Sequence, residues 1–181
     1  MFTRAVPAFI AALTLCVAAA AHELRAEKIL DGKAEISIPS EFTVMSDEMK
    51  HVKYPTGNPP QVVFTDEDGA INVAASTRHI GPAKLKDMVP ALANTISRVR
   101  NITTWHDKGL RTINGREFAF LEFTAAAVDT DTYNYIYFTL DGPELLMFTV
   151  NCTVAKAPQW RETLHKSVSS TRILTGPSQS E

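Results

Sequence analysis

Three turn sequences divide residues 104–154 into four strand-like segments, and this spacing of turns constrains the fold more than any other feature. Asn114-Gly115 tolerates the positive φ angles of a two-residue type I′ turn. Asp129-Thr130-Asp131-Thr132 and Asp141-Gly142-Pro143 have the composition of two further turns. The segments are rich in aromatic and β-branched residues and comprise Trp105–Ile113, Arg116–Val128, Tyr133–Leu140 and Glu144–Val154. The sequence therefore predicts a four-stranded antiparallel meander.

Further strand-like segments precede the meander. Residues 34–38 alternate apolar and polar side chains and stop at Pro39, a pattern typical of a half-buried strand that residues 42–45 continue. Residues 61–65 and 71–77 flank the acidic stretch Asp66-Glu67-Asp68-Gly69. Two β-rich segments around an acidic turn that ends in glycine predict a hairpin.

Two segments have the apolar periodicity of helices. The first follows Pro82 and predicts a helix of about five turns through Leu85, Met88, Val89, Leu92, Ile96 and Val99. Pro90 interrupts this pattern, so we expect a kink or a local break there. The second begins at Pro158 and places Trp160, Leu164 and Val168 on one face.

This order of elements predicts an α+β fold: a twisted antiparallel sheet of about six strands, the meander included, with helices packed on it. We expect a single domain over residues 34–175. A polar segment, residues 22–33, precedes it, and residues 176–181 form a frayed tail.

The first 21 residues have the pattern of a cleavable secretory signal peptide: one basic residue, an apolar run and the small residues Ala19-Ala20-Ala21. The competing hypotheses are a retained membrane anchor, for which the run is too short, and a lipoprotein modified at Cys16, where Leu15 stands in place of the required small residue. Cleavage leaves 160 residues and changes the net charge from −2 to −3, because the signal holds one basic residue and no acidic one. We therefore expect a periplasmic or secreted protein with no membrane insertion after cleavage and no nucleic-acid partner.

Several motifs resemble those of the PsbP/DcrB-like group, which also includes the Mog-type Ran-binding proteins. They are Ile36-Ser37-Ile38-Pro39-x-x-Phe42, the hairpin and long helix after it, Asn114-Gly115-Arg116-Glu117, and a closing helix with Trp160 and Ser169-Ser170. The resemblance spans most of residues 30–174 and implies an antiparallel sheet flanked by helices. Members of the group mostly bind other proteins, and the group supplies no shared catalytic residues.

Cys152 is the one cysteine that remains after signal cleavage, so the mature chain has no internal disulfide. Strand alternation places Cys152 on the same face as Leu146, Phe148 and Val150. We therefore expect this thiol to be buried as a small hydrophobic group rather than exposed and reactive.

Tyr133, Tyr135 and Tyr137 fall on one sheet face and are candidates for partner binding, because tyrosines often anchor interfaces. The alternative is that a helix covers them and their hydroxyls reach the rim. Asp129 and Asp131, in the turn before this strand, are further partner-binding candidates.

Metal binding has one weak candidate. Cleavage after Ala21 places His22 at the mature N-terminus, where its amine and ring nitrogen bind copper if a further histidine, such as His51 or His106, lies nearby. His79 and His165 are scattered singly, and the alternative is a frayed terminus with an accidental histidine. The acidic turns at 66–69 and 129–131 lack the spacing of a calcium loop, so turn chemistry explains them.

No nucleophile elbow or zinc-protease motif occurs in the sequence, and no cofactor is predicted. The sequence favours a non-enzymatic exported protein that binds another envelope or secreted protein, in an immunity, inhibitor or assembly-factor type of role. Two alternatives remain open: a periplasmic copper-binding protein that uses His22, and a hydrolase with an unfamiliar site.

Overall fold

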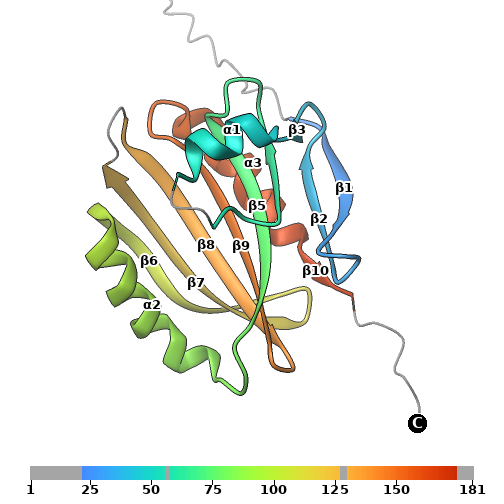
Figure 1. Ribbon diagram of the computed structural model, residues 1–181, viewed down its shortest axis with the longest axis vertical. Helices are drawn as coiled ribbons and strands as arrows, with labels where there is room; N and C mark the ends of the chain where they lie inside the picture. Colours follow the sequence, from blue (N-terminus) through green and yellow to red (C-terminus); the bar gives the residue numbers. More distant parts are fainter. Residues whose placement is uncertain (1–21, 56–57, 127–129, 175–181) are drawn as a thin grey trace, which may run out of the picture.

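A seven-stranded antiparallel sheet forms the centre of the protein (Figure 1). The computed structural model describes residues 22–55, 58–126 and 130–174, so the predicted signal peptide and the tail 176–181 lie outside the described residues. The strand order is β3-β4-β5-β9-β8-β7-β6, and a smaller sheet has the order β1-β2-β10. These elements confirm the α+β fold class, with more strands than the predicted six.

The predicted meander forms one half of the large sheet. Its strands are β6 (Asn101–Ile113), β7 (Arg116–Ala126), β8 (Thr132–Asp141) and β9 (Glu144–Thr153). Asn114 and Gly115 have φ angles of 47° and 81°, which are the left-handed values that a type I′ turn requires. The turn signals therefore identified the meander correctly.

The other half of the large sheet comes from the predicted hairpin. Its strands are β4 (Val62–Thr65) and β5 (Ile71–His79), and the two-residue β3 (Thr43–Val44) pairs with β4 at the edge. Strand β5 pairs with β9 along its whole length, from Ile71 opposite Cys152 to His79 opposite Glu144. This pairing joins the hairpin to the meander in one continuous sheet.

The small sheet contains a strand that the sequence analysis missed. Residues 22–33, predicted only as a polar segment, include β1 (Leu24–Ile29), which pairs with β2 (Ala34–Pro39). Leu30 and Asp31 adopt positive φ angles in the turn between these strands, and Ile29 and Leu30 are buried. The two-residue β10 (Arg172–Ile173) pairs with the other side of β2.

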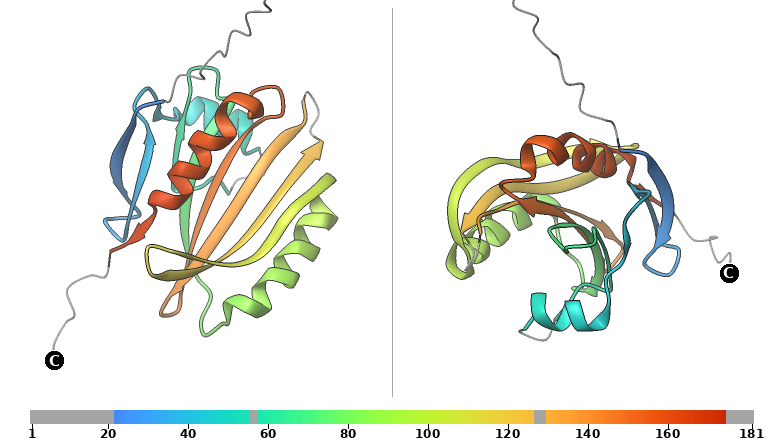
Figure 2. Two further views of the ribbon diagram at one scale, coloured as in Figure 1. Left: turned by 180° about the vertical axis from the view of Figure 1, so that it is seen from behind. Right: turned by 90° about the horizontal axis from the view of Figure 1, so that it is seen from above.

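Helices cover both faces of the large sheet (Figure 2). Helix α3 (Ala157–Ser170) lies on one face, while α1 (Asp47–Lys53) and α2 (Leu85–Val99) lie on the other. The break expected at Pro90 is wrong, because α2 continues through this residue. Pro90 and Lys86 are both exposed, so water can reach the Lys86 carbonyl that the missing N–H leaves without a helical partner.

The two faces bury separate cores. On the α3 face, Trp160, Leu164 and Val168 pack against inward side chains of the large sheet and of β2. On the other face, Ala93 and Ile96 of α2 pack against alternate residues of β7. None of the helices within residues 22–55, 58–126 and 130–174 has the length and apolar character of a membrane span.

Strand β6 forms a long edge of the large sheet, next to β7 alone. Its register with β7 shifts between Ile102 and Thr104 and again between Trp105 and Asp107. Shifts of this kind are β-bulges, which bend the strand and interrupt the row of outward-facing backbone groups.

Cys152 is buried on the α3 face, as the strand alternation predicted, with 1% of its surface exposed. Burial raises the pKa of its thiol to about 11. A buried thiol with a raised pKa supplies little thiolate, the form that reacts.

We predict that Cys152 in a chain beginning at His22 does not react with a thiol reagent such as Ellman's reagent under native conditions. It reacts fully once the protein is unfolded in denaturant. Val154 is 41% exposed just beyond β9, so V154C provides a control thiol that reacts at once. Rapid modification of Cys152 in the native wild type would contradict the packing described above.

Candidate functional site

The three candidate tyrosines of β8 lie beneath helix α3. Tyr133 is 2% exposed, and Tyr135 and Tyr137 are fully buried. The Tyr137 hydroxyl lies 2.7 Å from Oγ1 of Thr171, just after α3. The partner-contact prediction for these tyrosines is therefore corrected: α3 covers them, and they present no surface to a partner.

Of the two aspartates before β8, the structure describes only Asp131. Asp129 lies outside the described residues. Asp131 is exposed, and its carbonyl oxygen accepts a hydrogen bond from the Val154 amide at 2.9 Å. Contact of either aspartate with a partner remains a prediction.

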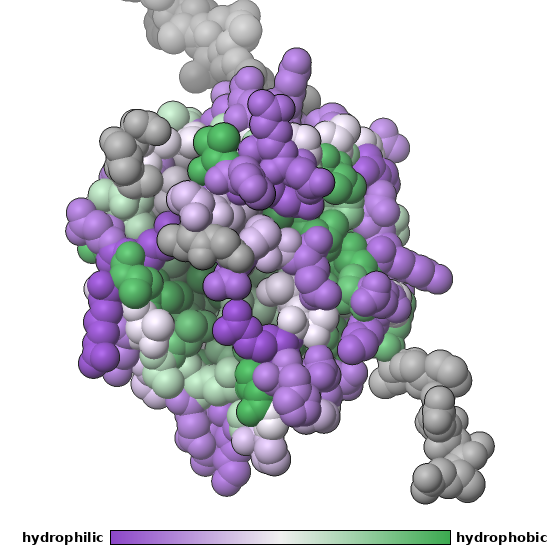
Figure 3. Space-filling model, viewed as in Figure 1, coloured by the Kyte–Doolittle hydropathy of each residue, from purple (hydrophilic) through white to green (hydrophobic). Residues whose placement is uncertain are grey.

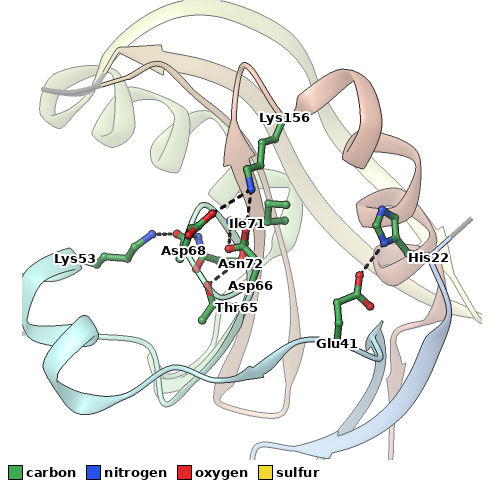
Figure 4. Close-up of polar contacts among 10 residues, drawn as sticks. His22, Glu41, Lys53, Thr65, Asp66, Asp68, Ile71, Asn72 and Lys156 are labelled. Atoms are coloured by element: carbon green, nitrogen blue, oxygen red, sulfur yellow. Dashed lines mark hydrogen bonds and ion pairs between the residues drawn. The ribbon is translucent and has the colours of Figure 1, made fainter. Parts of the chain in front are cut away.

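His22 packs against the domain instead of fraying (Figure 4). Its ring stacks on Trp160 with 3.7 Å between centroids, and Nδ1 lies 2.7 Å from a carboxylate oxygen of Glu41. His106 bonds to Thr124 at 2.8 Å, and His51 is exposed on α1. In the part of the chain that the structure describes, no three histidine, cysteine or carboxylate side chains form a group able to hold a metal. The side-chain contacts of His22 among the described residues are with Trp160 and Glu41, and copper binding at His22 remains a prediction.

The acidic turn between β4 and β5 is held by local bonds and by two lysines (Figure 4). Lys53 at the end of α1 donates to the Gly69 carbonyl. Asp66 accepts a hydrogen bond from the Ile71 amide at 2.9 Å. Nζ of Lys156, just before α3, lies 3.2 Å from Asp66 and 3.7 Å from Asp68. This turn thus fastens the hairpin tip to the start of α3.

A buried polar cluster lies between β7, β8 and α3, and the sequence analysis missed it. Glu122 is 5% exposed, and it accepts hydrogen bonds from Arg161 and, at 2.8 Å, from the Tyr133 hydroxyl. Nε2 of His165 lies 2.7 Å from the same hydroxyl. Glu122 is the only charged residue inside the otherwise apolar stretch of β7 from Phe118 to Phe123, and that exception was the available signal.

The directions of the hydrogen bonds in this cluster agree with its pKa shifts. Burial alone would raise the pKa of Glu122, but the bonds from Tyr133 and Arg161 outweigh it and hold the pKa below 4.5. Burial lowers the pKa of His165 below 6.5, although Glu122 opposes the shift. An ionised Glu122 accepts the Tyr133 proton, so neutral His165 must carry its proton on Nε2 and donate to the Tyr133 oxygen. The cluster links α3 to the sheet through two side chains of the helix.

We predict that the free energy of unfolding decreases as the pH falls below 6.5. The unfolded chain then binds a proton at His165 that the folded chain resists, and below 4.5 Glu122 adds a second loss. Urea midpoints between pH 7.5 and 5 measure the first loss. H165Q, whose amide can still donate to Tyr133, should flatten that slope, whereas H51Q on exposed α1 should follow the wild type. Equal slopes in the wild type and H165Q would contradict the assignment.

A groove crosses the sheet face opposite α3, between α2 and the segment that precedes β4. It consists of three adjoining hollows of about 240, 480 and 130 Å³. Figure 3 shows apolar side chains recessed on this face. The α2 wall is formed by Leu92, Ile96 and Val99, the floor by Ala74, Ile136, Met147 and Thr149, and the opposite wall by Tyr54, Pro59 and Pro60.

Polar groups are placed at specific points of this mainly apolar groove. Asn134 of β8 and Asn151 of β9 are half-buried, and they lie opposite each other in the sheet. Arg100 follows α2 at the rim, and Arg78 lies at the end of β5. A concave apolar surface with a few convergent polar groups is typical of a binding site. This groove is the candidate functional site.

No family model and no curated protein matches the chain. Solved structures do match. Cyanobacterial PsbP (CyanoP) from Synechocystis is 15% identical, with 85% of this chain and 94% of that protein covered and a TM-score of 0.60. The chain has the PsbP/Mog1 fold.

Two further structures show the same fold. LpqN from Mycobacterium tuberculosis, which is involved in cell envelope biogenesis, is 8% identical, with 84% of this chain and 91% of LpqN covered and a TM-score of 0.59. The Ran-binding protein Mog1p from Saccharomyces cerevisiae is 10% identical, with coverages of 84% and 96% and a TM-score of 0.53. The resemblance to the PsbP/DcrB-like group is thereby confirmed at the level of the fold.

Proposed function

We propose that this protein is an exported, non-enzymatic binding protein that recognises another envelope or secreted protein through the groove. The observation that carries the proposal is the strip of sheet that α1 and α2 leave uncovered, lined mainly by apolar side chains. Val99 at its wall is 71% exposed, although it belongs to the apolar stripe of α2. An apolar surface of this kind gains free energy when a partner removes it from water.

A protein of the same fold supports the proposal of partner binding, and the sequence supports the proposal of export. Mog1p, which shares the fold, is a Ran-binding protein, so a member of this fold binds another protein. Fold likeness alone does not carry a partner or an activity from one member to another. The proposal of export rests on residues 1–21, which have the composition of a cleavable signal.

The Glu122 cluster bears on the hydrolase alternative. Its carboxylate already accepts bonds from Arg161 and Tyr133, and only 7% of the Glu122 side chain is exposed. An acid or base must reach the proton of a bound substrate, which an enclosed and fully engaged carboxylate does poorly. The groove, which is open to solvent, therefore has the stronger claim as the functional surface.

We predict that V99E abolishes co-purification of the partner from an envelope extract, because it introduces a charge into the apolar wall. Val99 is already exposed, so the change should alter the free energy of unfolding by less than about 0.5 kcal/mol. V154E makes the same change at an exposed site outside the groove lining and should retain the partner. Equal recovery of the partner with both variants would overturn the assignment of the groove.

We predict that intact mass spectrometry of the protein recovered from the envelope shows a chain beginning at His22. A21L should block this cleavage, because signal peptidase requires a small residue before the cleaved bond. V154E leaves the signal unchanged and should be processed normally. A wild-type chain that retains residues 1–21 would contradict export by this route.

A further inference from the structure

The groove is elongated along the strands. Leu145, Met147, Thr149 and Asn151 of β9 share the face opposite α3, and together they line all three hollows. Six residue steps of a strand span about 20 Å. A trough of that length matches an extended chain of about six residues better than a compact small molecule.

The charged residues that line the groove are all basic. Arg78 and Arg100 line it, whereas none of its lining residues carries a carboxylate. Within the described residues, neither arginine forms an ion pair. Two guanidinium groups without a carboxylate partner favour an occupant that brings carboxylates.

The asparagines of the floor have hydrogen-bonding capacity left over. Nδ2 of Asn72 donates to Oδ1 of Asn151 at 2.9 Å, and Nδ2 of Asn134 donates to the Thr132 carbonyl at 3.0 Å. In the described residues, the amide N–H groups of Asn151 and the amide oxygen of Asn134 have no such partner, and both residues line the groove. An amide presents one donor and one acceptor together, which complements the donor and acceptor of a peptide group.

We propose that the groove binds an extended segment of the partner polypeptide in which apolar and acidic side chains alternate. This inference rests on the proposed function and specifies what the partner presents. The apolar side chains pack on Met147 and on the α2 wall, the carboxylates meet Arg78 and Arg100, and the peptide groups bond to Asn134 and Asn151. A fatty acid offers a carboxylate and an apolar chain, but it has no peptide group for the asparagine amides.

The test uses three probes with the mature protein: acetylated, amidated octapeptides of alternating Leu-Asp and alternating Leu-Lys, and sodium oleate. Binding is followed by NMR through the side-chain amide signals of Asn134 and Asn151. Of the three probes, we expect only the Leu-Asp peptide to cause saturable chemical-shift changes. Its affinity should decrease as salt is added, because salt screens the charge attraction. Stronger or equal binding of the Leu-Lys peptide, binding of oleate at these signals, or no shift with any probe would overturn the proposal.

Arginine variants supply the matched control. R78Q with R100Q should weaken the Leu-Asp peptide about tenfold, at roughly threefold for each exposed charge pair. Arg98 is exposed on α2, two residues before Arg100 and outside the groove lining. R98Q therefore removes a nearby charge and should leave the affinity for the peptide unchanged. Similar losses with R98Q and the double variant would show non-specific charge attraction and overturn the assignment of the arginines.

Two further outcomes separate this inference from the function on which it rests. If V99E loses the partner but no peptide binds, the groove is the binding surface and the extended segment is refuted. If V99E keeps the partner, the proposed function itself fails. Shifts of the same amide signals with protein concentration alone would identify a second copy of this chain as the occupant and overturn the proposal.

Discussion

The antiparallel pairing of β5 with β9 is the constraint on which the rest of the structure depends. It joins the hairpin from the first half of the chain to the meander from the second half, in a register that runs from Ile71 and Cys152 to His79 and Glu144. Bringing such distant segments together costs chain entropy. Burial of apolar side chains of both strands on the α3 face, including Val73 and Phe148, offsets that cost.

The same pairing creates two faces with different properties. Helix α3 and the small sheet close one face over aromatic side chains, and the bonds of Glu122 and Asp66 fasten the helix at two places. On the other face, α2 lies mainly over β6 and β7 while α1 packs near β4, so Met147 and Thr149 of β9 are only half-buried in the strip between the two helices. The groove therefore lies where the two helices leave this face only partly covered, and its floor consists of inner strands that are paired on both sides.

Local signals made much of the fold predictable. Asn114-Gly115 specified its turn, and period-two alternation placed Cys152 correctly. Alternation tells which side chains share a face but not what covers that face, so it left the fate of Tyr135 open. The sequence analysis missed β1 because the charged residues Arg25, Glu27 and Lys28 make up half of this strand. The break expected at Pro90 does not occur because this exposed position in α2 tolerates a lost backbone bond. The groove could not be predicted, since it depends on distances between elements remote in sequence.

The bulged edge strand β6 has a consequence for how this molecule meets others of its kind. A long, flat outer strand invites a second sheet to add to it and to propagate into larger aggregates. Here the two register shifts near Ile102 and Asp107 interrupt the template, while the opposite edge, β3, is only two residues long. Sideways growth of the large sheet is thus disfavoured at both of its edges. The large sheet can therefore leave part of one face open to solvent without also offering a regular edge to a strand of another chain.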